Sequence, residues 1–207
     1  MLVIPHAHQT GEYRISDADV ENLVEVLSLH GAFEWFGQKY LEQGHEVGFI
    51  AASDDHLSHP GYAAANGGLG YRSGLAAVVA PEKSRDAIFD SLKARRTYAT
   101  SGERIILDYD VSGGGFGQRI AMTDKRTVKL RAIGTAPIRE ITIVKNGRDV
   151  FTQDYLADPT GKSNRIAVEF FSATDPQIRD NARGWRRWEG TLTVKGARMD
   201  GFSAPGF

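Results

Sequence analysis

Two short segments of the chain combine residue types and spacing that are typical of a metal site. One is Asp54-x-His56, which follows the apolar, strand-length run Val47–Ala52. On an extended backbone, residues two apart point to the same side, so the Asp54 carboxylate and the His56 imidazole are predicted to share a side. A carboxylate and an imidazole that converge where a buried strand ends are a common way for α/β proteins to hold a divalent metal.

The other segment is His6-Ala7-His8, which follows the apolar run Leu2–Pro5. If the backbone stays extended there, His6 and His8 also share a side. Together the two segments offer nitrogen and oxygen ligands that favour Zn, Mn or Fe over Ca or Mg. The alternative is that these residues form hydrogen-bonded pairs in turns at the ends of strands, and the sequence leaves both interpretations open.

Composition excludes several classes of function. The chain has 207 residues, which suits one or two domains, and its 41% hydrophobic and 25% charged residues are ordinary for a soluble globular protein. A net charge of −1 provides no field to attract nucleic acid or an anionic membrane, so neither is an expected partner. Cysteine is absent, which excludes disulfides and thiolate ligands. No signal peptide is recognisable, so the cytoplasm is the default location, although a longer parent protein could be exported.

The pattern of elements changes near residue 104. Before it, apolar runs such as Gly74–Ala80 alternate with helical patterns at Glu34–Gln43 and Ser84–Arg95, the second of which begins with a capping serine. Alternating strands and helices predict a parallel sheet or part of a barrel over residues 1–103. The segment Ser16–Leu29 fits either a helix or a strand, and its periodicity does not decide between them.

Residues 104–207 have the pattern of an antiparallel β domain. Asn146-Gly147 is the strongest hairpin signal in the chain. Asp108 and Asp110 share one face of a strand, which is more typical of a solvated face than of a calcium site. Short strands separated by turn residues predict a sandwich. The expected strands are Ile105–Val111, Thr127–Ile133, Glu140–Lys145, Ile166–Phe170 and Gly190–Val194.

Several segments occur in the same order in a known family. The chain resembles a bacterial family of uncharacterised proteins similar to the polymerase-and-histidinol-phosphatase (PHP) superfamily of metal-dependent phosphoesterases. The Ser-Asp-x-His and Arg-Arg-Thr-Tyr-Ala-Thr motifs are the most specific parts of this resemblance. The segments that carry it are Val3–His6, Val24–Gly31, Gly48–His56, Ala94–Ile105 and Gly134–Ile138.

The resemblance implies a fold and a set of roles. The fold would be the C-terminal portion of a PHP-like distorted (β/α) barrel followed by an antiparallel β-sandwich-like domain. His6, Asp54 and His56 would be metal ligands at the ends of barrel strands. A strand at Leu23–Ser28 would place His30 just beyond it, so that His30 or His8 could support the ligands or act as the general acid.

The resemblance also implies that the chain is incomplete. Its early motifs, a His-x-His and later Glu and His ligands, would lie upstream of residue 1, and the β domain over residues 104–207 would be truncated. We therefore expect part of a metal-dependent hydrolase that acts on a small, phosphorylated substrate. The alternatives are a non-catalytic module whose β domain binds carbohydrate or a partner, and an inactive truncated product. Open barrel edges would expose unpaired strand groups, so we expect the isolated chain to self-associate.

Overall fold

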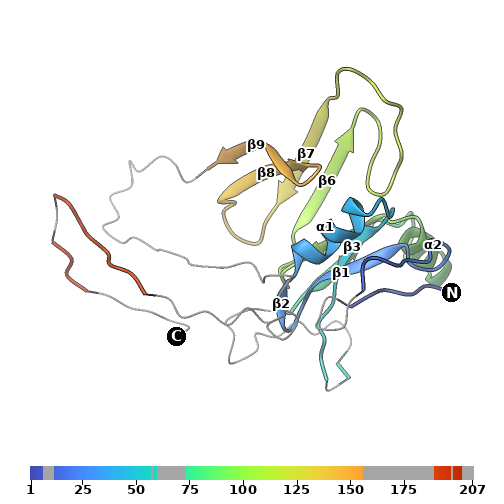
Figure 1. Ribbon diagram of the computed structural model, residues 1–207, viewed down its shortest axis with the longest axis horizontal. Coiled ribbons are helices and arrows are strands. Elements are labelled where there is room, and N and C mark those ends of the chain that lie inside the picture. Colours follow the sequence, from blue (N-terminus) through green and yellow to red (C-terminus); the bar gives the residue numbers. More distant parts are fainter. Residues whose placement is uncertain (7–11, 57, 60–72, 156–188, 197, 202–207) are drawn as a thin grey trace.

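The computed structural model describes residues 1–6, 12–56, 58–59, 73–155, 189–196 and 198–201. Within them the protein is mostly β, with antiparallel sheets and two short helices (Figure 1). No helix in this part of the chain is long and apolar enough to cross a membrane. The elements are β1 (Leu23–Ser28), β2 (Gly31–Ala32), α1 (Glu34–Glu42), β3 (Gly48–Ala51), β4 (Leu75–Val78), α2 (Arg85–Lys93), β5 (Thr97–Thr100), β6 (Ile106–Val111), β7 (Val128–Ile133), β8 (Glu140–Lys145) and β9 (Arg148–Asp154).

The segment that fitted either a helix or a strand contains β1. Its buried residues form a nearly continuous run, as expected for a strand covered on both faces. β1 pairs in parallel with β3, and the two-residue β2 pairs with the end of β1 in the antiparallel sense. Because β1 and β3 run in the same direction, their carboxyl ends meet at one edge of the sheet.

The apolar run Leu2–Pro5 does not form a regular strand. The segment still runs beside β1, where the Glu25 N–H donates to the Pro5 carbonyl over 3.1 Å and the Val3 N–H donates to the Val20 carbonyl over 2.8 Å. Pro5 has no N–H to donate, so it cannot take part in a complete strand ladder.

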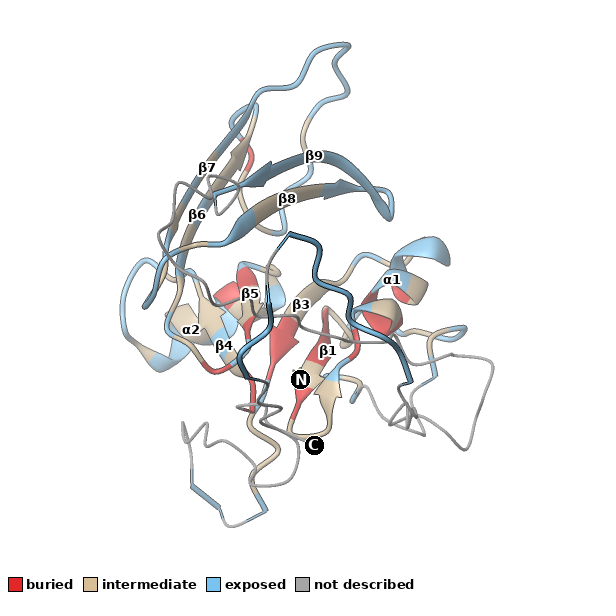
Figure 2. Ribbon diagram, turned by 90° about the vertical axis from the view of Figure 1, so that its left-hand side faces the viewer, coloured by how far each residue is buried: buried red, intermediate tan, exposed pale blue. Residues whose placement is uncertain are grey.

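α1 covers the sheet and builds the core. Its predicted extent is confirmed to within one residue, and Gly44, with φ +85°, lies just beyond the helix end as a left-handed terminator. Phe36 and Tyr40 of α1 pack with β1 in a buried apolar cluster, and Figure 2 shows the buried residues gathered in β1, β3 and α1. Burial raises the pKa of Tyr40 to about 12, and its hydroxyl donates to the Glu12 carbonyl over 2.7 Å.

The prediction of parallel strands is wrong for β4 and β5, which pair antiparallel. The Val79 N–H donates to the Arg96 carbonyl over 2.8 Å. The backbone hydrogen bonds between β4 and β5 therefore continue to residues just before and just after the segment that contains α2. α2 is therefore inserted in the loop of a hairpin and does not form a crossover between parallel strands. Its capping serine is confirmed, because Ser84 Oγ accepts the Ala87 N–H over 3.2 Å.

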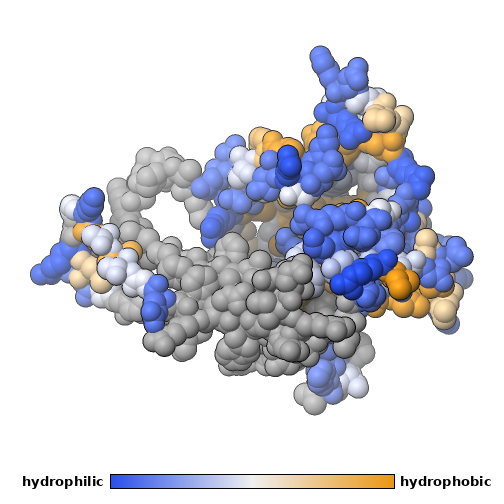
Figure 3. All heavy atoms as spheres, viewed as in Figure 1, coloured by the Kyte–Doolittle hydropathy of each residue, from blue (hydrophilic) through white to orange (hydrophobic). Residues whose placement is uncertain are grey.

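The described residues after 103 form two antiparallel hairpins and contain no helix. β6 pairs with β7, and β8 pairs with β9 through the predicted Asn146-Gly147 turn. Asn146 and Gly147 have φ values of 52° and 70°, the two positive values of a type I′ turn. Large apolar side chains are exposed on both hairpins, including Ile133, Val144 and Phe151, and orange patches appear in the upper part of Figure 3.

Two expected strands have different outcomes. Ile166–Phe170 lies outside the described residues. The expectation of a strand at Gly190–Val194 is wrong, since these residues are exposed and irregular. A strand needs a neighbour for its backbone groups, and no described residue pairs with this segment.

The two halves of the chain contact each other around the start of β6. The Tyr98 hydroxyl on β5 donates to the Ile105 carbonyl over 2.9 Å and accepts the Leu107 N–H over 3.2 Å. The Arg95 guanidinium also donates to the Gly117 carbonyl over 3.3 Å. These bonds connect β5 and the end of α2 to the first β hairpin.

Candidate functional site

The Asp54-x-His56 segment is a turn in the structure. β3 ends at Ala51, and Asp54 has a φ of +49°, in the left-handed region that aspartate tolerates better than most residues. The assumption of an extended backbone is therefore wrong at this position. The two side chains nevertheless meet, with His56 Nε2 and Asp54 Oδ1 3.2 Å apart.

A second imidazole reaches Asp54 from β1. His30 follows the end of β1, and its backbone N–H donates to the buried Ser28 hydroxyl over 3.1 Å. Its Nε2 lies 3.2 Å from Asp54 Oδ2. Because β1 and β3 are parallel, the residues that follow them meet at one edge of the sheet, and Asp54 lies between His30 and His56.

One oxygen of Asp54 has no adequate hydrogen bond. Oδ2 is buried and lacks a partner of acceptable geometry, although it is within ion-pair distance of His30. The separation of 3.2 Å between His30 Nε2 and Asp54 Oδ2 is short enough for an ion pair, but the two groups are not aligned for a hydrogen bond. A misaligned contact at 3.2 Å satisfies a carboxylate oxygen poorly. A buried acceptor without a partner carries a desolvation cost that a cation would relieve.

A third imidazole belongs to a neighbouring pair. His6 Nδ1 contacts the Glu25 carboxylate, which is buried in the middle of β1. Burial raises the pKa of Glu25 above its ordinary value. The hydrogen bond and charge of His6 oppose this rise in the pKa, whereas the negative charge of Asp54 adds to it. The negative charge of Asp54 therefore acts on the His6–Glu25 pair as well as on its own two imidazoles.

Glu25 is the site residue that the sequence interpretation missed. Its signal was present, because a glutamate in the middle of the apolar run Leu23–Ser28 is rarely buried without a specific partner. Periodicity alone did not decide between a helix and a strand there, and the strand that the resemblance implied was used only to place His30.

The two motif segments contain two further residues with ligand chemistry, His8 and Asp55. His8 lies outside the described residues. Asp55 pairs with His59, whose Nδ1 lies 3.2 Å from Asp55 Oδ2. The His59 N–H also donates to this oxygen over 2.7 Å, which is the contact of a simple turn.

The assembled cluster consists of His6, Glu25, His30, Asp54 and His56. Imidazole nitrogens and carboxylate oxygens are the ligands of Zn, Mn and Fe sites in proteins. In their present positions, no three His, Asp or Glu side chains of the described residues form a group that could hold an ion. The side chains instead form carboxylate–imidazole pairs, so that an ion would have to open some of these pairs to bind.

Comparisons with known proteins give a partial match. Residues 68–136 match a family described as protein of unknown function (DUF3604), and this region contains β4, α2, β5, β6 and β7. An uncharacterized protein of Chlamydia muridarum is 33% identical over 88 residues, which cover 40% of this chain and 14% of that protein. A second, from Chlamydia pneumoniae, is 27% identical over 140 residues, covering 56% of this chain and 22% of that protein.

A third relative, from Chlamydia trachomatis, is 33% identical over 82 residues, covering 37% of this chain and 13% of that protein. The chain thus spans between 13% and 22% of the length of these curated relatives. No solved structure matches the chain.

Proposed function

We propose that the chain carries part of the site of a metal-dependent hydrolase, and that the bond it cleaves is a phosphoester. The position of Asp54 supports this proposal most directly. Its carboxylate lies 3.2 Å from both His30 and His56, at the shared carboxyl edge of two parallel strands. Catalytic sites of (β/α) barrels occupy this edge of their sheets.

The donor atoms of the cluster have the chemistry of a Zn, Mn or Fe site, and the side chains would have to leave their present pairs to surround an ion. Asp54 Oδ2 is a buried acceptor with no adequate hydrogen bond, and histidine nitrogens lie on both sides of the carboxylate. When bound, such an ion would supply Lewis-acid chemistry, polarising a phosphoryl oxygen and lowering the pKa of a water molecule.

The contacts suggest a role for each side chain. His6, Asp54 and His56 would be ligands, and the Glu25 carboxylate would orient the His6 ring by accepting its Nδ1–H. That orientation assigns Nε2 as the ligating atom of His6. His30 is less exposed than His56 and would donate a proton to the leaving group or complete the ligand set. His8 stays a candidate for the general-acid role.

The hydrolase that we propose is larger than this chain. The parallel pair of β1 and β3 would be part of a PHP-like barrel, whose further ligands would come from the parent protein. The substrate would be a small phosphorylated molecule. On this basis the chain alone should turn over substrate slowly or not at all, because a catalytic site usually needs three protein ligands and a supporting set of hydrogen bonds.

A direct comparison of two proteins tests this proposal. The 207-residue chain and the longer parent protein would be assayed against an aryl phosphate with Mn²⁺ or Zn²⁺. We expect metal-dependent turnover by the parent, which Asp54→Asn should lower by at least about a hundredfold, as expected for loss of a ligand. Asp149→Asn is the matched control, because Asp149 is an exposed carboxylate on β9. Full turnover by parent Asp54→Asn would place the chemistry elsewhere.

A further inference from the structure

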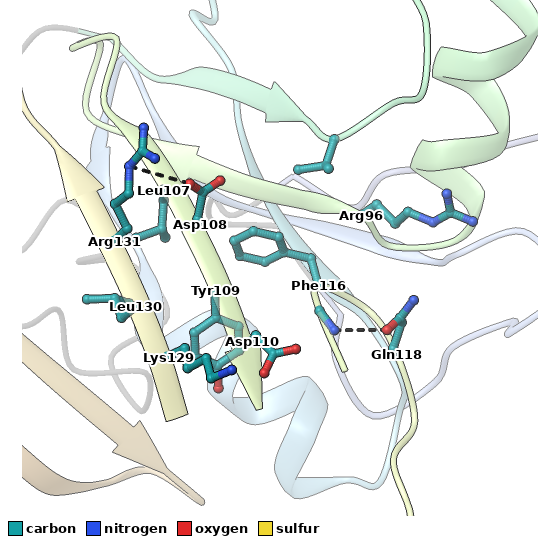
Figure 4. A pocket seen from close by; sticks show the side chains of 12 residues that line it. Arg96, Leu107, Asp108, Tyr109, Asp110, Phe116, Gln118, Lys129, Leu130 and Arg131 are labelled. Carbon is teal, nitrogen blue, oxygen red and sulfur yellow. Dashed lines mark hydrogen bonds and ion pairs between the residues drawn. The ribbon is translucent and has the colours of Figure 1, made fainter. Parts of the chain in front are cut away.

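A pocket of about 420 Å³ lies between the two halves of the chain. Arg96, at the start of β5, borders it on one side, and β6 and β7 border it on the other (Figure 4). All of its lining residues fall within the segment 68–136 that matches the family of unknown function.

This pocket is separate from the histidine cluster. Gly48 begins β3 and approaches Arg95 so closely that an added Cβ would lie 2.9 Å from the Arg95 Cβ. The pocket is therefore near the amino end of β3, whereas Asp54 follows its carboxyl end. A ligand in the pocket would need no metal bound at Asp54.

An aromatic wall lines the pocket and is held in place. Phe116 stacks on Tyr98 with ring centroids 5.3 Å apart, and Tyr109 lies 5.8 Å from Phe116 on the pocket wall. The Tyr98 hydroxyl bonds across to the start of β6. The loop that carries Phe116 is fixed at Gly117, which has a φ of +71° and would place a Cβ 2.3 Å from the Ala94 carbonyl oxygen.

The two carboxylates of the pocket already have partners. Asp108 lies 3.7 Å from the Arg131 guanidinium on the neighbouring strand, and Asp110 accepts the Gly113 N–H over 3.1 Å. Both carboxylates are only partly engaged by these contacts, since each oxygen has more than one acceptor site. They remain able to accept hydrogen bonds from hydroxyl groups.

The two other cations of the pocket are uncommitted. Arg96 and Lys129 form no side-chain hydrogen bond or ion pair with any residue that the structure describes. Lys129 lies directly across from Asp110 in the β6–β7 register, and Figure 4 shows Arg96 on the other side of Phe116. Their positive charges are therefore available to an anionic ligand.

We propose that this pocket binds an acidic sugar, in which the ring carries a carboxylate or a phosphate. The aromatic wall suits the apolar face of a sugar ring. The carboxylates of Asp108 and Asp110 suit its hydroxyl groups, and Arg96 and Lys129 suit its negative charge. A neutral sugar would leave the two cations unused, and an ion without a ring would leave the aromatic wall unused. This site goes beyond the proposed hydrolase function and does not depend on it.

Binding of simple sugars to the intact chain tests this site. Glucuronate, glucose 6-phosphate and glucose would be titrated into the 207-residue chain in EDTA, with NMR amide shifts as the measure of affinity. We expect saturable binding of at least one charged sugar, and glucose should bind at least about tenfold more weakly, since it lacks the charge-assisted bonds. Whichever charged sugar binds more tightly identifies carboxylate or phosphate as the preferred group.

Substitutions in the pocket distinguish recognition of the sugar's charge from recognition of its ring. Lys129→Ala and Arg96→Ala should each weaken binding of the charged sugar about tenfold. They should leave binding of glucose unchanged, because only a charge-assisted bond is lost. Phe116→Leu should weaken binding of all three sugars. Lys145→Ala is the control, because it removes an exposed lysine on the other hairpin. The amide spectrum reports whether each variant is folded. No saturable binding, equal binding of glucose, or an equal loss in Lys145→Ala would overturn the proposal, even if Phe116→Leu fails to fold.

Discussion

Asp54 links the groups of the candidate site. It contacts two imidazoles and also influences the pKa of Glu25, so its carboxylate connects residues that are distant in the sequence. The sequence predicted the types and the proximity of Asp54 and His56 from local spacing. Local spacing did not predict the left-handed backbone of Asp54. It also gave no contact with His30, which depends on the parallel pairing of β1 and β3, and only the resemblance placed His30 near the ligands.

Glu25 should make the stability of the protein depend on pH. Its pKa is raised in the folded state, so the folded protein binds this proton more tightly than the unfolded chain does. The carboxyl group therefore favours folding below its ordinary pKa of 4.5, and that contribution is lost as pH rises through the raised value. Glu25→Gln should gain stability relative to the wild-type protein as pH increases over this range.

Urea unfolding at a series of pH values measures this difference. Repeating the comparison in a His6→Gln background separates the burial of Glu25 from its pairing with His6, and the difference should be larger there because His6 lowers the pKa of Glu25. A stability difference between Glu25→Gln and the wild-type protein that stays constant with pH would contradict a raised pKa.

At the scale of elements, short-range signals gave reliable predictions. The serine cap of α2, the glycine after α1 and the Asn146-Gly147 turn all act within a few residues of the chain, and each is present in the structure. The direction of β5 relative to β4 was not predictable in this way. A helical segment between two strands can be a crossover or an insertion in a hairpin, and only the backbone ladder that reaches Val79 and Arg96 distinguishes them.

The close packing of α1 on the sheet gives a sharp prediction at Gly37. A Cβ at this position would lie 2.7 Å from Phe49 and 2.8 Å from Val26. Gly37→Ala gains about 1 kcal/mol of helix propensity. Overpacking the core costs about 1–3 kcal/mol, so the net free energy of unfolding should fall.

Gly190→Ala is the matched control for Gly37→Ala, because no non-neighbouring atom of the described residues lies within 4 Å of the Cβ that it would add. Its stability should stay within about 0.5 kcal/mol of the wild-type value. Chemical denaturation of both variants gives the comparison. If Gly37→Ala proves as stable as the wild-type protein, α1 does not pack as tightly on β1 and β3 as these distances require.

At the scale of the whole molecule, the two hairpins expose large apolar side chains. Isolated two-stranded ribbons are marginal in water, and their unpaired edges can pair with other chains. Val144 is 61% exposed on β8 and Phe151 is 50% exposed on β9. We therefore expect the chain to self-associate reversibly, with sedimentation velocity showing larger species as the concentration rises.

Charge placed on the hairpin should oppose this association. Val144→Lys should shift the chain toward the monomer, because a lysine on an edge ribbon disfavours pairing with another copy. Ile15→Lys adds the same charge at a site that is 79% exposed and outside the hairpins, so it should leave association unchanged. Equal effects of the two variants would indicate general charge repulsion, and a wild-type chain that stays monomeric would refute the prediction.

The order of the elements was predictable only in outline. The change from helices and strands to strands alone near residue 104 follows from local patterns, and both helices of the described residues precede it. The contacts of Tyr98 and Arg95 with the first β hairpin were not predictable, because they join residues whose spacing carries no periodic signal. The pocket that these contacts create was equally hidden from the sequence.

Metal binding at Asp54 tests the central claim most directly. The 207-residue chain would be titrated with Mn²⁺, and the loss of the free-ion signal in electron paramagnetic resonance would give the bound fraction. We expect weak, saturable binding near one ion per chain, which Asp54→Asn should weaken about tenfold or more. Asp149→Asn should bind Mn²⁺ as the wild-type chain does. Binding that is absent in the wild-type chain, or unchanged in Asp54→Asn, would contradict a metal centre at this edge of the sheet.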